Sequence, residues 1–196
     1  MWDLGDVLVR WSPVAAVTAG VGESEARRFL AEFDFASWNH ACDAGTSWDD
    51  ALAVLERDHP RWVAHGRAYR EHFGLALTGE VPGSVDLLRT LDAAGVRQVA
   101  LTNFSDELYR AHMPARFDFL RLFADVVVSG SEGLAKPDPA IYRLAATRIG
   151  LPLERLVFID DRQVNVDAAR SLGMTGVLFV DAERLGADLR RAGLPV

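Results

Sequence analysis

Residues 156–161 have the sequence Leu-Val-Phe-Ile-Asp-Asp, a short apolar run that ends in two adjacent carboxylates. Such a run is typical of a strand that is buried on both faces of a parallel sheet. Similar apolar runs occur at three other places in the second half of the chain. They cover Val96–Leu101, Phe123–Ser129 and Gly176–Val180. These strands predict an α/β fold built on a Rossmann-like parallel sheet.

Segments with helical patterns alternate with these strands, so we expect helices on both faces of the sheet. The expected helices are Ser84–Ala94, Asp106–His112, Asp138–Ile149 and Asn165–Leu172.

The stretch from Ser12 to about Pro82 has a different pattern, with no convincing strand. Apolar residues at helical spacing predict helices in its three most regular parts. These are Glu23–Phe33, Trp48–Arg57 and Pro60–Phe73. We therefore expect a small helical-bundle cap at residues 12–81, inserted after the first strand. The α/β core domain would comprise residues 1–11 and 82–196.

Polar side chains follow several of the strands, and ligands bind beyond the carboxyl ends of strands in an open parallel sheet. Asp3 and Asp6 follow the start of the chain, and Asp160 and Asp161 follow the run at residues 156–159. Thr102, Asn103 and Lys136 lie after the other strands or in their loops. We expect these groups to form one cluster.

The chemistry of this cluster is coherent. Neighbouring carboxylates repel each other unless a cation joins them, and hard oxygen ligands suit Mg²⁺. An aspartate can attack phosphorus and form an aspartyl-phosphate, while Mg²⁺ and an ammonium neutralise the transferring group. Lys136 is the only lysine among 21 basic residues. A compact ammonium fits such a cluster better than a planar guanidinium, which favours a functional role for Lys136.

Four motifs in order resemble those of the haloacid dehalogenase superfamily, specifically the subfamily with a helical cap after the first strand. The resemblance covers nearly the whole chain. The motifs are Asp3–Leu8, Leu101–Asn103, Ala135–Tyr142 and Phe158–Met174.

The resemblance implies a role for each matching residue. Asp3 is the expected nucleophile and a metal ligand, together with the backbone carbonyl of Gly5. Thr102 is expected to bind the phosphoryl group, and Asn103 to shape that loop. Lys136 would stabilise the negative charge of the nucleophile and of the phosphoryl group. Asp161 would bind Mg²⁺, with Asp160 as a further ligand or a support through water.

Two positions depart from the family pattern. Family phosphatases usually carry an acid/base aspartate two residues after the nucleophile, where this chain has Gly5. Asp6, or Asp43 from the cap, is a candidate replacement. Only Met1 and Trp2 precede Asp3, so the first strand is expected to be truncated, with unpaired backbone groups on its neighbours. Either the natural protein begins earlier or it tolerates a frayed strand.

The cap is expected to close over the site and to select the substrate. The candidate substrate-binding residues are Trp38 and Asp43 in the cap, with Thr102 and Asn103 in the core. Phe35 and Trp48 are expected to be cap core. A cap of this size suits small molecules, such as sugar phosphates.

Composition restricts the partners. The net charge of −7 disfavours non-specific nucleic-acid binding, which depends on basic surfaces. No apolar run approaches the length of a membrane span, and no signal peptide is recognisable. We expect a cytoplasmic monomer or homodimer that acts on a small phosphate ester.

Three functions remain open. The adjacent Asp160 and Asp161 favour a Mg²⁺-dependent phosphatase, because a metal-free 2-haloacid dehalogenase does not need both. Gly5 instead favours the dehalogenase, because a halide leaving group requires no acid. Gly5 and the short start also suit a catalytically impaired binding protein.

Overall fold

The computed structural model describes residues 1–196 and has the α/β arrangement with a parallel sheet that the sequence predicts. Two pairs of parallel strands, β3 with β4 and β5 with β6, belong to one sheet. The strands are β3 (Val99–Thr102), β4 (Asp125–Val128), β5 (Val157–Asp160) and β6 (Thr175–Leu178). Each lies within three residues of its expected range.

Residues 1–3 fill the centre of the sheet. Trp2 forms parallel bridges to Ala100 of β3 and to Ile159 of β5, which gives the order β4, β3, residues 1–3, β5, β6. The Trp2 N–H donates to the Val99 carbonyl (2.9 Å), and the Asp3 N–H donates to the Ile159 carbonyl (2.9 Å). The short segment thus pairs with both neighbours through residues 1–3.

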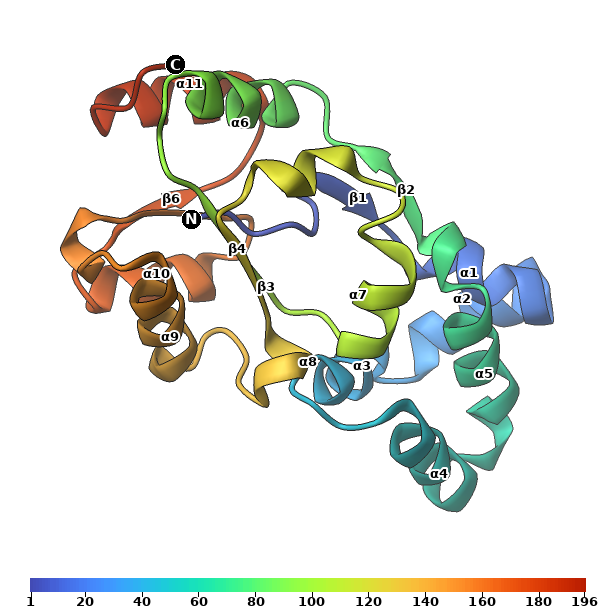
Figure 1. The fold of residues 1–196 in the computed structure, drawn as a ribbon. Coiled ribbons are helices and arrows are strands. Elements are labelled where there is room, and N and C mark those ends of the chain that lie inside the picture. Colours follow the sequence, from blue (N-terminus) through green and yellow to red (C-terminus); the bar gives the residue numbers. More distant parts are fainter.

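Alternate residues of the central strands pack into two separate cores. Trp2, Ala100 and Ile159 face one cluster, while Met1 and Phe158 face the other. Figure 1 shows α6 and α11 on one side of the sheet and α9 and α10 on the other. This period-two division is the expected consequence of covering both faces of a parallel sheet.

The four core helices that we expected start and end close to the expected positions, and two further core helices were not expected. Ser105 caps α7 by accepting a hydrogen bond from the Leu108 N–H, and Gly150 ends α9 in the left-handed conformation. The core helices are α6 (Ser84–Ala93), α7 (Asp106–His112), α8 (Ser129–Glu132), α9 (Pro139–Ile149), α10 (Gln163–Ser171) and α11 (Ala182–Arg191), with 3₁₀ turns at Asp118–Leu122 and Leu153–Arg155.

The residues between the first strand and α6 are mainly helical and pack beside the core (Figure 1). The expected third helix is divided into a 3₁₀ turn at Pro60–Trp62 and α5, and α1 and α3 were not expected. The helices are α1 (Pro13–Val21), α2 (Glu23–Glu32), α3 (Phe35–Asp43), α4 (Trp48–Asp58) and α5 (Val63–Glu71), followed by a 3₁₀ turn at Phe73–Ala76. None of the helices combines the length and apolarity that a membrane crossing requires.

One feature of this region contradicts the sequence analysis. A two-stranded antiparallel ribbon, β1 (Val9–Trp11) with β2 (Leu77–Glu80), joins the helical insertion to the core. We expected no strand between Ser12 and Pro82. β2 is short and contains Gly79, which has a φ of 135° and lowers the strand signal.

The central position of Trp2 leads to a stability prediction. Its indole N–H donates to the Gln98 side-chain carbonyl at 2.9 Å, and the residue is 1% exposed. Trp2→Phe leaves that buried carbonyl without this donor, so we expect a loss of about 1–3 kcal/mol beyond the loss of ring area. Urea unfolding measures the effect. Trp62→Phe, at a cap tryptophan that is 2% exposed, is the control, and equal losses in the two variants would contradict the prediction.

Candidate active site

A buried lysine joins two carboxylates at the carboxyl ends of the central strands. The Lys136 ammonium lies 2.8 Å from Asp3 Oδ1 and 2.7 Å from Asp160 Oδ2. Lys136 is 1% exposed, Asp160 is 0% exposed and Asp3 is 8% exposed. Residues far apart in the sequence thus meet at one point.

Burial and charge oppose each other in this group. Burial alone would lower the pKa of Lys136, but the two carboxylates raise it, so the ammonium keeps its proton. Burial raises the pKa of Asp3 to about 7, against the opposing effect of Lys136. The nearby charge of Asp160 contributes to this raised pKa. A cation close to Asp3 would favour its ionised form.

Both carboxylate oxygens of Asp160 accept hydrogen bonds. Its Oδ1 accepts hydrogen bonds from the Arg162 N–H (2.8 Å) and from Asn165 Nδ2 (3.0 Å), and its Oδ2 accepts from Lys136. Asn165 lies in the first turn of α10, five residues after Asp160. The sequence analysis gave Asn165 no role, although its spacing from the acidic pair was visible.

Asp161 differs from Asp160 because its side chain is exposed. Oxygen atoms of Asp3, Asp160 and Asp161 lie within 4.8 Å of one another. Asn165 Oδ1, nearby, is buried without a hydrogen-bond partner. An all-oxygen set with an unsatisfied acceptor fits Mg²⁺, which binds oxygen ligands and retains several waters.

Thr102 is the last residue of β3, and Asn103 follows it. Thr102 is 1% exposed and lines a cavity next to Asp3. The Asn103 side chain donates to the Lys136 carbonyl (2.9 Å) and accepts from the Lys136 N–H (2.8 Å). This pair of bonds fixes the Lys136 backbone, so Asn103 positions the lysine.

Two cavities meet at Asp3. One is enclosed and has a volume of about 130 Å³, and the other is an open cleft of about 590 Å³. The open cleft contains Lys136, Asp161 and Asn165. Six residues line both cavities, and these are Asp3, Gly5, Trp11, Asn39, Asp43 and Asn103.

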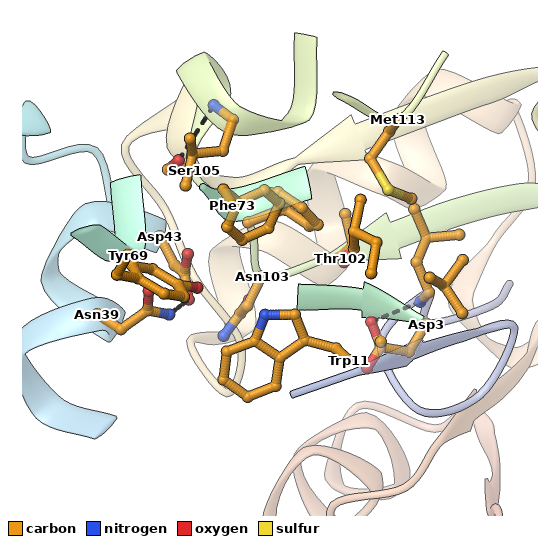
Figure 2. Close-up of a pocket in the computed structure, with 16 residues that line it drawn as sticks. Asp3, Trp11, Asn39, Asp43, Tyr69, Phe73, Thr102, Asn103, Ser105 and Met113 are labelled. Atoms are coloured by element: carbon orange, nitrogen blue, oxygen red, sulfur yellow. Dashed lines mark hydrogen bonds between the residues drawn. The ribbon is translucent and has the colours of Figure 1, made fainter. Parts of the chain in front are cut away.

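Asp43 brings a carboxyl group from α3 of the helical insertion to both cavities. Figure 2 shows Asp43, Asn39 and Tyr69 on elements of this insertion, with Asp3 and Thr102 on the segments of the parallel sheet. Asn39 Nδ2 donates to Asp43 Oδ2 at 3.0 Å. Burial raises the pKa of Asp43 to about 7, and the charge of Asp3 adds to this effect.

Trp38 requires a correction, because it does not line either cavity beside Asp3. It packs at the edge of the Trp48 ring, and its indole N–H donates to the Ala51 carbonyl at 3.0 Å. Trp38 is therefore part of the cap core. Tyr69 and Trp11, which the sequence analysis did not select, line the enclosed cavity instead.

Asp6 belongs to the turn after Asp3. It has a φ of 52°, and its Oδ1 accepts a hydrogen bond from the Trp11 N–H at 3.2 Å. Asp6 thus stabilises its own turn, in the manner of many loop aspartates.

Fold and site together define an α/β protein with a helical insertion and a lysine-linked acidic cluster at the carboxyl ends of its parallel strands. A model of the haloacid dehalogenase-like hydrolases matches residues 2–173. The chain belongs to this family of hydrolases, which confirms the resemblance seen in the sequence.

Curated relatives have diverse names. Drimenol cyclase from Aspergillus calidoustus is 29% identical over 90% of this chain and 33% of its own length. Sesquiterpene phosphatase from Aspergillus oryzae is 30% identical over 54% of this chain and 53% of its own length. Glyceraldehyde 3-phosphate phosphatase from Methanocaldococcus jannaschii is 27% identical over 68% of this chain and 59% of its own length. The chain thus covers between a third and three fifths of the length of these relatives.

Solved structures share the fold. A family enzyme from Bacteroides thetaiotaomicron, in complex with magnesium, superposes with a TM-score of 0.69 at 20% identity over 96% of both chains. A predicted hydrolase of the same family from Porphyromonas gingivalis gives a TM-score of 0.72 at 18% identity, over 100% of this chain and 97% of that one.

The lysine link generates a stability prediction. In Lys136→Met, Asp3 and Asp160 face each other without the ammonium, and we expect unfolding to require about 3–5 kcal/mol less in EDTA. Added Mg²⁺ should stabilise the variant more than the wild type, because a divalent ion would compensate the facing carboxylates. Denaturant unfolding with and without Mg²⁺ measures both effects.

The matched control is Arg148→Met, which removes a cation that pairs with Glu132 at 2.6 Å on the surface. Such a pair contributes at most about 1 kcal/mol. Equal losses in the Lys136 and Arg148 variants would show that the buried link does not stabilise the site.

Proposed function

We propose that the protein is a Mg²⁺-dependent phosphatase that hydrolyses small phosphate monoesters through an aspartyl-phosphate on Asp3. The observation that carries the proposal is the contact of Asp3 with Lys136, beside the adjacent Asp160 and Asp161. Two relatives, a sesquiterpene phosphatase and a glyceraldehyde 3-phosphate phosphatase, have names consistent with this reaction.

The protein's own groups orient the nucleophile. The Leu4 N–H and the Lys136 ammonium both lie 2.8 Å from Asp3 Oδ1. These contacts fix the carboxylate and leave Oδ2 as the oxygen that neither group holds. In the proposed first step this carboxylate bonds to phosphorus, and the ester P–O bond breaks. In the second step water attacks phosphorus, which releases phosphate and restores Asp3.

Asp3, Asp161 and the Gly5 carbonyl are the proposed direct ligands for Mg²⁺. Asp160 supports the site, because hydrogen bonds already engage both of its oxygens. When bound, Mg²⁺ would neutralise charge on the transferring phosphoryl group. Lys136 adds a fixed positive charge, and Thr102 contributes a hydroxyl beside Asp3. We further propose that residues 12–81 act as the cap that excludes water from this site.

Asp43 is the proposed acid and base in place of the group missing at Gly5. It lines both cavities together with Asp3. Because burial raises the pKa of Asp43 to about 7, it holds a proton in weakly acidic solution. This proton can pass to the leaving alkoxide, and the resulting carboxylate can then take a proton from the attacking water.

A phosphate-release assay on a panel of esters tests the main proposal. We expect turnover with Mg²⁺, none in EDTA, and a loss on the order of 10³ or more in Asp3→Asn, which removes the nucleophile. Asp167→Asn, at an exposed position on α10, is the control.

The same experiment separates the alternatives. Halide release from 2-haloacids without Mg²⁺ would identify a dehalogenase. A folded protein that releases neither phosphate nor halide would instead be a catalytically impaired binding protein.

The acid role of Asp43 predicts a dependence on the leaving group. Alkyl phosphates need a proton on departure, whereas p-nitrophenyl phosphate does not. Asp43→Asn should therefore slow alkyl phosphates by about 10²–10⁴, with little effect on p-nitrophenyl phosphate. For the wild type, kcat on alkyl phosphates should fall above about pH 7 as Asp43 loses its proton.

Gly5→Asp provides a rescue, because a Cβ at Gly5 meets no atom within 4 Å. Added to Asp43→Asn, it should restore part of the alkyl phosphate activity. Asp58→Asn, on the exposed end of α4, is the cap control. An equal decrease for both leaving groups would exclude Asp43 as the proton donor.

A further inference from the structure

We propose that the organic part of the substrate is a compact apolar group of about five or six carbons, bound in the enclosed cavity beside Asp3. This inference rests on the proposed phosphatase function and specifies its substrate class. It departs from the sugar phosphates that the sequence led us to expect.

The walls of the enclosed cavity are mainly apolar. Nine of its sixteen lining residues are hydrophobic, including Phe73, Leu77, Leu108 and Met113. Each of these four side chains is at most 4% exposed, so this part of the wall belongs to the packed interior. Figure 2 shows Phe73 and Met113 on the same side of the cavity as Thr102.

Three polar side chains of the cavity, Asn103, Ser105 and Asn39, already form hydrogen bonds within the protein. Asn103 is bonded to the Lys136 backbone, and the Ser105 hydroxyl accepts from the Trp48 indole at 2.9 Å. Asn39 donates to Asp43. A sugar placed here would leave several of its hydroxyl groups without hydrogen bonds, which is costly in a buried site.

Thr102 and Asp3 line the part of the enclosed cavity that lies beside the acidic cluster. A phosphoryl group at Asp3 can therefore remain beside Lys136 in the open cleft while its ester oxygen points into the apolar cavity. Asp43, which lines both spaces, would lie near that oxygen. The geometry thus separates a charged end from an apolar end.

The size of the cavity limits the apolar group. Its volume is about 130 Å³. An apolar cavity of about 150 Å³ holds a benzene molecule, so five or six carbons are close to the capacity here. Each methylene removed from water should improve binding about fourfold.

A homologous series of n-alkyl phosphates, from methyl to octyl, tests the inference in the chain of residues 1–196 with Mg²⁺. We expect kcat/KM to rise about fourfold per methylene up to five or six carbons and then to level off or fall. Glycerol phosphate and ribose 5-phosphate should be at least about tenfold poorer than alkyl phosphates with the same number of carbons. A flat series, or a preference for the polar esters, would overturn the inference.

Variants of the cavity wall make the test specific. Met113→Ala should shift the optimum to longer chains by enlarging the cavity, and Leu108→Phe should shift it to shorter chains. Met174→Ala is the matched control, because Met174 is equally apolar and 4% exposed but belongs to the other core cluster. If Met113→Ala and Leu108→Phe both keep the wild-type optimum, the apolar group does not bind in this cavity.

Binding measurements distinguish this inference from the proposed reaction. Alkylphosphonates carry the same apolar chains but cannot be hydrolysed, so calorimetry reports their affinity whether or not the protein turns over esters. Affinity that rises with chain length, without turnover of any ester, would refute the phosphatase and retain the apolar site. Turnover combined with an affinity that is independent of chain length would refute the apolar site alone.

Discussion

The ion pair of Lys136 with Asp3 and Asp160 is the constraint on which the site depends. It joins the start of the chain, the loop before α9 and the end of β5 at atomic contact. Two buried carboxylates at this spacing would repel each other strongly without the ammonium. Asn103 fixes the lysine backbone and Asn165 fixes Asp160. The cluster is therefore rigid, and a cation or phosphoryl group would meet it without reorganisation.

The parallel sheet was predictable because its strands are buried on both faces and therefore have continuous apolar sequences. β5 illustrates this, since the apolar run at residues 156–159 identifies it directly. β1 and β2 were missed because a short ribbon with Gly79 has neither an apolar run nor clear alternation. The pairing of Trp2 on both sides depends on long-range hydrogen bonds, which no local pattern records.

For the site, sequence order and residue type were enough to select Asp3, Lys136, Asp160 and Asp161, because parallel strands end at one edge. In the helical insertion, the aromatic residues that line the cavity could not be selected from the sequence. Trp38 and Tyr69 are both aromatic residues on cap helices, and only packing decides which one reaches the cavity. The apolar cavity itself arises from residues on several elements, so its chemistry could not be read from any one segment.

The ribbon of β1 and β2 has a role beyond connecting two parts of the chain. Trp11 and Leu77 are paired across it, and both side chains line the enclosed cavity. Any rotation of the helical insertion about this ribbon must therefore move the wall against which a ligand packs. Ligand occupancy and hinge angle are then thermodynamically linked, so a ligand that fills the space favours one angle by its differential affinity.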